Sequence, residues 1–266
     1  MQRPERPFPL AVTWSHQPSG EVVADTRRVA EAWGLPLYER PHKSGLKQQL
    51  GREAAAFLVR GGTGWRLVDV DGELGVSPGL AMLRLKRLDA GSTMAEPILA
   101  HAEVRAGDVV IDATVGLGAD ARVLARAVGA AGRIVGVEAS LPLAVLLSEG
   151  LRLEPRWPNS APIEVRHGRA LDVLRGLPSA SADVVFFDPM FERTLGASPA
   201  FVALRRFADH APFGVDVVDE ARRVARRWVL MKSSDPSLFP SLGLEALVPP
   251  AGAHVFWGRA RGDGNL

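Results

Sequence analysis

A glycine-containing turn follows an apolar run near the middle of the chain. The run ends at Asp112 and leads into Gly116-x-Gly118. Glycine lets the backbone approach a ligand closely and adopt positive φ, and the start of the helix expected next offers free N–H groups to a carboxylate or phosphate. Glu138 ends the following apolar run, 22 residues after Gly116, where a carboxylate can accept hydrogen bonds from both hydroxyls of a ribose. These residues predict a site for a cofactor that contains a nucleoside.

The turn itself leaves the cofactor open. Gly116-x-Gly118-x-x-Ala121 fits the fingerprint of dinucleotide-binding proteins. Counted from Asp112, the same residues resemble the first motif of class I S-adenosylmethionine-dependent methyltransferases, in which an acidic residue precedes a glycine-rich turn. Thr114 then stands where the first glycine is usual. A plain strand-to-helix turn without a ligand is the remaining alternative.

A second motif favours methyl transfer. Asp188-Pro189-Met190-Phe191 ends a later apolar run and resembles the [Asp/Asn]-Pro-Pro-[aromatic] motif of methyltransferases that modify exocyclic amines. An aryl amine is a poor nucleophile, and acceptors for its two hydrogens return electron density to nitrogen and orient its lone pair. We expect the Asp188 carboxylate and the Pro189 carbonyl to be those acceptors, and Phe191 to stack on the base. The alternative is a strand-end turn with a buried phenylalanine.

Two further strand ends hold weaker candidates. The segment His167-Gly168-Arg169-Ala170 has no acid for an adenine amino group, so backbone atoms of Arg169 and Ala170 are the expected contacts. Lys232 closes the last apolar run, where it could meet a substrate phosphate or be a simple strand-end cation.

Alternating elements must position these residues. Strand-like runs occur at 108–112, 133–138, 163–166, 183–188 and 228–232. Helical patterns intervene at 119–128, 142–151, 170–174 and 217–226. This order predicts an α/β fold with a doubly wound, mostly parallel sheet, to which a hairpin within 243–257 adds an antiparallel strand. Residues 1–91 are expected to form a small α+β region that helps to capture RNA, and residues 92–266 the domain that binds the cofactor.

The composition excludes several classes of protein and of active site. The 266 residues are 47% hydrophobic and 23% charged, as in soluble globular proteins. Without cysteine, thiolate metal sites and thiol catalysis are excluded, and the scattered histidines predict no metal. No apolar stretch is long enough for a membrane span, so we expect a cytoplasmic protein. Of the 32 basic residues, 28 are arginine, and the basic segment 84–87 either binds phosphate or is a solvated face.

Taken together, DATVGLGADA, VEAS, HGRAL, DPMF and VLMKSSD resemble the small-subunit ribosomal RNA guanine-N2 methyltransferases of the J type and their bacterial relatives. The resemblance covers roughly residues 75–257. It implies a seven-stranded Rossmann-like sheet, S-adenosylmethionine as cofactor and 16S rRNA or the small ribosomal subunit as partner. It places cofactor contacts on Asp112, Thr114, Gly116, Gly118, Ala119, Asp120, Glu138, Ala139, Arg169, Ala170 and Asp188. From the residues themselves, we expect catalytic groups at Asp188, Pro189, Phe191 and Lys232, and RNA contacts at Arg84, Lys86, Arg87 and Arg193.

The sequence departs from that family in two places. Arg169-Ala170 stands where the family has hydroxyl residues, and Glu192-Arg193-Thr194-Leu195 follows DPMF in place of Pro-His-Lys. The leading hypothesis is methylation of an exocyclic amine in RNA, at guanine N2 of 16S rRNA. The alternatives are a methyltransferase for a small-molecule or protein amine, a nucleotide-binding module without catalysis, and an NAD(P)-dependent oxidoreductase, which lacks an evident hydride-transfer set.

Overall fold

The chain forms two compact units, described here from a computed structural model. The structure describes residues 8–40, 45–76, 79–91, 96–189, 204–209, 213–250 and 252–265. The first unit is drawn from residues 1–76, 145–155 and 198–207, and the second from the remainder.

The first unit has a four-stranded sheet in the order β1-β2-β3-β4. Its elements are β1 (Phe8–Trp14), α1 (Gly20–Ala32), β2 (Ala54–Gly61), β3 (Gly64–Val68) and β4 (Glu73–Gly75). β1 pairs parallel with β2, and the other pairs are antiparallel. Phe57 is fully buried in a cluster with Ala11, Val59 and Val68, so alternate β2 residues supply the core of this unit.

An ion-pair cluster lies on α1 of the first unit. Asp25 accepts hydrogen bonds from Arg60 at 2.8 Å and from Arg28 at 3.1 Å, and it also pairs with Arg152. Burial raises the pKa of the Asp25 carboxyl, but the hydrogen bonds and charges of the three arginines outweigh it and lower that pKa below its usual value. The cluster therefore stabilises ionised Asp25 in the folded protein.

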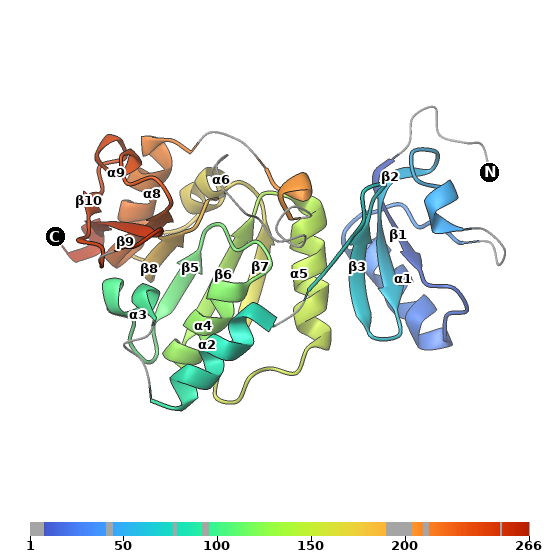
Figure 1. The fold of residues 1–266 in the computed structure, drawn as a ribbon, viewed down its shortest axis with the longest axis horizontal. Coiled ribbons are helices and arrows are strands. Elements are labelled where there is room, and N and C mark those ends of the chain that lie inside the picture. Colours follow the sequence, from blue (N-terminus) through green and yellow to red (C-terminus); the bar gives the residue numbers. More distant parts are fainter. Residues whose placement is uncertain are drawn as a thin grey trace. The chain divides into compact units, whose positions relative to one another are not determined.

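The second unit holds a seven-stranded sheet in the order β10-β11-β9-β8-β5-β6-β7 (Figure 1). Its strands are β5 (Val109–Asp112), β6 (Arg133–Glu138), β7 (Ile163–His167), β8 (Ala182–Phe187), β9 (Ala225–Ser233), β10 (Glu245–Ala246) and β11 (Phe256–Arg261). The five strands from β5 to β9 pair parallel, and the last two pair antiparallel. Strand order reverses beside β5, which creates the crevice where open α/β sheets bind ligands.

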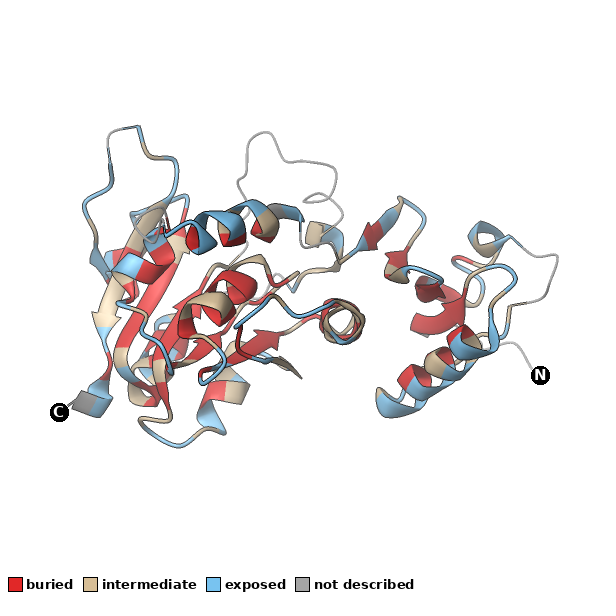
Figure 2. Ribbon diagram, turned by 90° about the horizontal axis from the view of Figure 1, so that it is seen from below, coloured by how far each residue is buried: buried red, intermediate tan, exposed pale blue. Residues whose placement is uncertain are grey.

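Helices cover both faces of this sheet. They are α2 (Gly79–Asp89), α3 (Pro97–His101), α4 (Ala119–Val128), α6 (Ala170–Arg175), α8 (Val215–Val224) and α9 (Leu238–Ser241). A further helix, α5 (Leu141–Leu153), begins in this unit, and its residues from 145 onward belong to the first unit. Ile111, Val185 and Met231 point to one face and form a buried cluster with residues of α6, α8 and α9. Alternate residues such as Val110 point to the other face, where α2 packs on α4. Figure 2 shows the central strands between these layers as buried.

The observed architecture confirms the predicted fold class. The parallel strands, the intervening helices and the closing antiparallel hairpin all form where the sequence pattern predicted them. One helix ends earlier than the sequence pattern predicts: α8 ends at Val224 because β9 already begins at Ala225. The basic segment 84–87 lies within α2, which belongs to the second unit. The functional division of the chain at residue 91 stays a prediction. Among the described residues, no helix has the length and apolar character needed to cross a membrane.

Candidate active site

The shape of the turn after β5 is set by two glycines and by a side chain that bonds to the turn's backbone. Gly116 and Gly118 adopt φ values of 53° and 74°, the left-handed region that glycine occupies without strain. The Arg122 side chain donates to the carbonyls of Leu117 at 2.8 Å and Gly118 at 2.9 Å. No atom lies within 4 Å of the position that a Cβ of Gly116 would take. The turn therefore leaves open space for a ligand next to the start of α4.

Glu138 ties the end of β6 to this turn. Its Oε2 accepts from the Gly116 amide at 3.0 Å, and its Oε1 accepts from the Ser140 amide at 2.8 Å. Burial raises the pKa of Glu138, and these backbone hydrogen bonds oppose the rise. Each carboxylate oxygen has a second lone pair, so Glu138 can shape the turn and still accept hydrogen bonds from a ligand hydroxyl.

Asp112 is the most buried acid at this edge of the sheet, with 1% of its surface exposed. Its Oδ1 accepts from the Thr114 amide at 3.3 Å. Burial is the main cause that raises the Asp112 pKa well above its usual value, and the nearby charges of Asp120, Asp188 and Glu138 raise it further. A cationic group of a ligand at this edge would favour the ionised form of Asp112.

Thr114 and Lys232 position Asp188 from two sides. The Asp188 amide donates to Thr114 Oγ1 at 2.7 Å, which joins the end of β8 to the turn after β5. Lys232 Nζ donates to Asp188 Oδ2 at 2.6 Å. Burial raises the pKa of Asp188 while the Lys232 charge lowers it, with a net rise. Because Lys232 occupies Oδ2, Oδ1 of Asp188 is the carboxylate oxygen available for an incoming donor.

A charge chain extends from this point to α2. Lys232 lies 3.7 Å from Asp120, and Asp120 pairs with Arg84 at 2.7 Å. Arg84 also pairs with Glu96 at 2.7 Å, just before α3. Burial lowers the Lys232 pKa, but Asp120 and Asp188 outweigh it and raise that pKa, so Lys232 stays protonated at neutral pH. These ion pairs connect α2, the residue before α3 and the start of α4 to the Asp188 carboxylate.

A cleft of about 490 Å³ opens beside Lys232 and Asp120. Its walls come from α2, α3, the start of β11 and the chain before it. The walls include Arg87, His101, Val248, His254 and Trp257. The His101 and Trp257 rings lie 5.5 Å apart at their centroids. The cleft thus combines aromatic surface with cations next to the Asp188–Lys232 pair.

The structure gathers most of the predicted site at one edge of the sheet. Asp112, Thr114, Asp120, Asp188 and Lys232 are linked by the contacts above, while Pro189 follows Asp188 directly. Ala119 begins α4, Ala139 follows β6, and Ala170 begins α6. Phe191 and Arg193 lie outside the described residues, so their predicted roles stay predictions.

The predicted RNA contacts differ in their surroundings. Arg84 is engaged with Glu96 and Asp120, whereas Lys86 and Arg87 are exposed on α2. The contact of these three residues with RNA stays a prediction. Arg169, a predicted cofactor contact, is exposed before α6 and pairs with Asp209 at 3.3 Å, and its role also stays a prediction.

Sequence reasoning missed most residues of the cleft walls, among them Glu96, His101 and Trp257. Glu96 carries a weak signal, because it precedes the proline that begins α3. His101 and Trp257 carry none, since only the pairing of β11 with β9 brings Trp257 beside Lys232.

Comparison with known proteins decides among the cofactors that the turn allows. Residues 81–202 match the family model "Putative SAM-dependent methyltransferase". The uncharacterized protein YpiP of Bacillus subtilis is 31% identical over 227 residues, covering 83% of this chain and 87% of that protein. The chain belongs to the SAM-dependent methyltransferase family.

Two more comparisons bear on this methyltransferase. Ribosomal RNA small subunit methyltransferase J of Pseudomonas aeruginosa is 33% identical over 177 residues, which span 65% of this chain and 64% of that enzyme. A solved SAM-dependent methyltransferase from Neisseria gonorrhoeae aligns with a TM-score of 0.62 at 22% identity, covering 96% of each chain. That structure supports the Rossmann-like fold of the second unit.

The methyltransferase uses S-adenosylmethionine as its cofactor. The residues at the sheet edge fit this molecule in charge and space. The open turn at Gly116 and the amides that begin α4 suit a carboxylate, and buried Asp112 suits an ammonium group. Glu138 ends β6, the position at which an acid binds ribose hydroxyls in such sheets. In the part of the chain that the structure describes, no group of side chains is arranged to hold a metal ion.

Proposed function

We propose that this methyltransferase modifies an exocyclic amine in RNA, namely N2 of a guanine in small-subunit ribosomal RNA. The observation that carries the proposal is the position of Asp188, whose amide is held by Thr114 and whose carboxylate is held by Lys232, a residue that also lines the cleft with His101 and Trp257. The name of the Pseudomonas aeruginosa relative supports ribosomal RNA as the substrate.

The chemistry follows from the state of Asp188. When bound, S-adenosylmethionine supplies an electrophilic methyl carbon on a sulfur that leaves as a neutral thioether. Asp188 Oδ1 accepts one amine hydrogen and the Pro189 carbonyl accepts the other, which orients the nitrogen lone pair. As the nitrogen becomes cationic, its surplus proton passes to Asp188, whose raised pKa makes it a better base, and then to water.

The cleft suits a base that has left its stack. The His101 and Trp257 rings offer stacking surface, and exposed Arg87 can contact a phosphate. A small free amine would not need such an open, cationic wall. Methylation of a small-molecule or protein amine is therefore an outcome of the test below, and a binding module without catalysis has no use for Asp188 held by Lys232.

The test measures transfer of labelled methyl from S-adenosylmethionine to small ribosomal subunits from cells that lack this protein. We expect label in the ribosomal RNA and a loss of at least about 100-fold in Asp188→Ala, as for removal of one preorganised polar group. Asp219→Ala, which changes an exposed acid on α8, is the matched control and should transfer normally. Cofactor binding without labelled RNA, or full transfer by Asp188→Ala, contradicts the proposal.

A further inference from the structure

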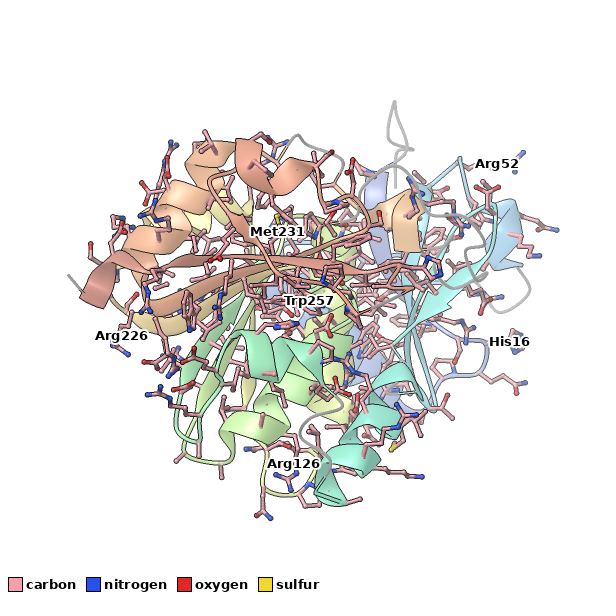
Figure 3. All side chains as sticks on the ribbon, turned by 60° about the vertical axis from the view of Figure 1, so that its left-hand side comes forward. His16, Arg52, Arg126, Arg226, Met231 and Trp257 are labelled. Atoms are coloured by element: carbon pink, nitrogen blue, oxygen red, sulfur yellow. The ribbon has the colours of Figure 1, made fainter. Side chains whose placement is uncertain are left out.

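The last antiparallel strand pair of the second unit has a cationic face. The register pairs Lys232 with Trp257, Leu230 with Arg259, and Trp228 with Arg261. Residues paired directly across antiparallel strands point to the same face. This face is the one that bears α3, because Trp257 contacts His101, whereas Met231 points into the cluster with α8 and α9 (Figure 3).

Two arginines share one indole on this face. The guanidinium carbons of Arg259 and Arg261 lie 4.3 Å and 4.8 Å from the ring centroid of Trp228. Neither arginine forms an ion pair with any residue that the structure describes. The contrast with their neighbours is clear, since Arg226 pairs with Asp183 and Arg227 with Asp108. We call Trp228, Arg259 and Arg261 the arginine track.

The arginine track is continuous with the cleft. Burial, and then the Arg259 charge, lowers the pKa of His101, which lines the cleft. The Trp257 ring contacts the His101 ring, and Trp257 is paired with Lys232 across strands β11 and β9. The five residues from Trp228 to Lys232 span about 13 Å along the strand.

We propose that the arginine track binds the phosphodiester backbone of the substrate RNA on one side of the target nucleotide. This inference rests on the proposed RNA substrate and assigns the path by which that RNA reaches the cleft. Stacking on Trp228 fixes the planes of both guanidinium groups, so little side-chain entropy is lost when they donate to phosphate oxygens. Phosphate also supplies the negative charge that no described carboxylate provides to them.

An acidic protein surface could offer similar charge, but the track favours RNA. It leads from Arg261 past Trp257 to the site of amine methylation, so a chain bound along it has its modified residue at Asp188. RNA presents regularly spaced phosphates along such a path, whereas a protein surface does not.

The test is binding of unmodified small-subunit rRNA transcript to the full-length protein as a function of salt. Each phosphate contact on a single strand contributes about 0.7 to the slope of log affinity against log salt. The double variant Arg259→Gln/Arg261→Gln should therefore lose about 1.4 of that slope, and about 25-fold in affinity at ~0.1 M salt. Binding of S-adenosylmethionine and the Tm should be unchanged, which shows that the variant is folded.

Two controls separate phosphate binding from packing. Arg175→Gln removes an exposed arginine from α6 on the opposite face and should change neither slope nor affinity. Arg259→Lys/Arg261→Lys keeps both charges and should retain most of the slope. The proposal for the arginine track is overturned if the salt slope of the Arg259→Gln/Arg261→Gln variant is unchanged, or if Arg175→Gln loses as much slope and affinity. If the wild type neither binds nor methylates RNA, the proposed function itself is wrong. If the wild type methylates RNA and the Arg259→Gln/Arg261→Gln variant binds RNA equally well, only the proposal for the arginine track is wrong.

Discussion

Replacing Lys232 by methionine tests how Asp188 is held. The change removes the ammonium group 2.6 Å from Asp188 Oδ2 and keeps most of the side-chain volume. A hydrogen bond between charged groups contributes roughly 1.5–3 kcal/mol. Because 28% of the Lys232 side chain and 35% of the Asp188 side chain are exposed, water screens the pair, and we use the lower end, about 1.5–2 kcal/mol. At 1.36 kcal/mol per tenfold change, kcat should fall by about 10- to 30-fold.

The pH dependence gives this prediction a sign. Burial already raises the Asp188 pKa, and Lys232 is the charge that lowers it. Without Lys232 the pKa rises further, so the carboxylate is protonated at a higher pH and cannot accept the amine hydrogen. The acid limb of the kcat profile for methyl transfer to ribosomal RNA should therefore move to higher pH. The affinity for S-adenosylmethionine, measured by calorimetry, serves as the check that the cofactor site is intact.

A double-mutant cycle isolates the contact. If Lys232 acts through Asp188, Lys232→Met should cost little in an enzyme that already carries Asp188→Ala. Lys232→Arg should retain the acid limb, because it keeps the charge. A Lys232→Met enzyme with unchanged kcat and an unmoved acid limb would refute the reasoning, as would full additivity with Asp188→Ala.

Three further changes have defined outcomes. Glu138→Gln replaces one acceptor oxygen by a donor that faces a backbone amide, so calorimetry should show S-adenosylmethionine binding weakened at least about tenfold; unchanged affinity contradicts the assigned role. Thr114→Val removes the acceptor of the Asp188 amide and should lower the free energy of unfolding, measured by urea titration, by about 1–3 kcal/mol. A variant as stable as the wild type would contradict this prediction. The folded-state pKa of Asp25 is lowered, so its stabilisation is present above its unfolded pKa and is lost as pH falls. The stability difference between wild type and Asp25→Asn should shrink as the pH falls below about 5, and a constant difference would show that the carboxylate charge is not involved.

The order of elements in the second unit was predictable because its central strands are continuous apolar runs. A parallel strand buried on both faces reads this way, as in β8, where four consecutive residues are buried. The end of each such run then places its next polar residue at the ligand edge. Asp112, Glu138, Asp188 and Lys232 were predictable from this rule and from the motifs that hold them, without any knowledge of their contacts.

Long-range contacts were beyond the sequence pattern. Nothing in the local sequence indicates that the Thr114 hydroxyl accepts from the Asp188 amide, 74 residues away. The basic segment 84–87 raised the same difficulty, since periodicity does not reveal that Arg84 faces Glu96 and Asp120 while Arg87 faces solvent. Pairing of β11 with β9 similarly decides which of its residues share a face with Lys232.

The hydrogen bond between Thr114 and Asp188 has a consequence for accuracy in group transfer. In the proposed mechanism, one side of this bond belongs to the turn that receives the methyl donor, and the other belongs to the group that orients the acceptor nitrogen. A displacement of the turn is therefore passed to Asp188 through a direct hydrogen bond. Under that mechanism, discrimination between targets depends on how accurately the acceptor amine is delivered to this connected pair of sites.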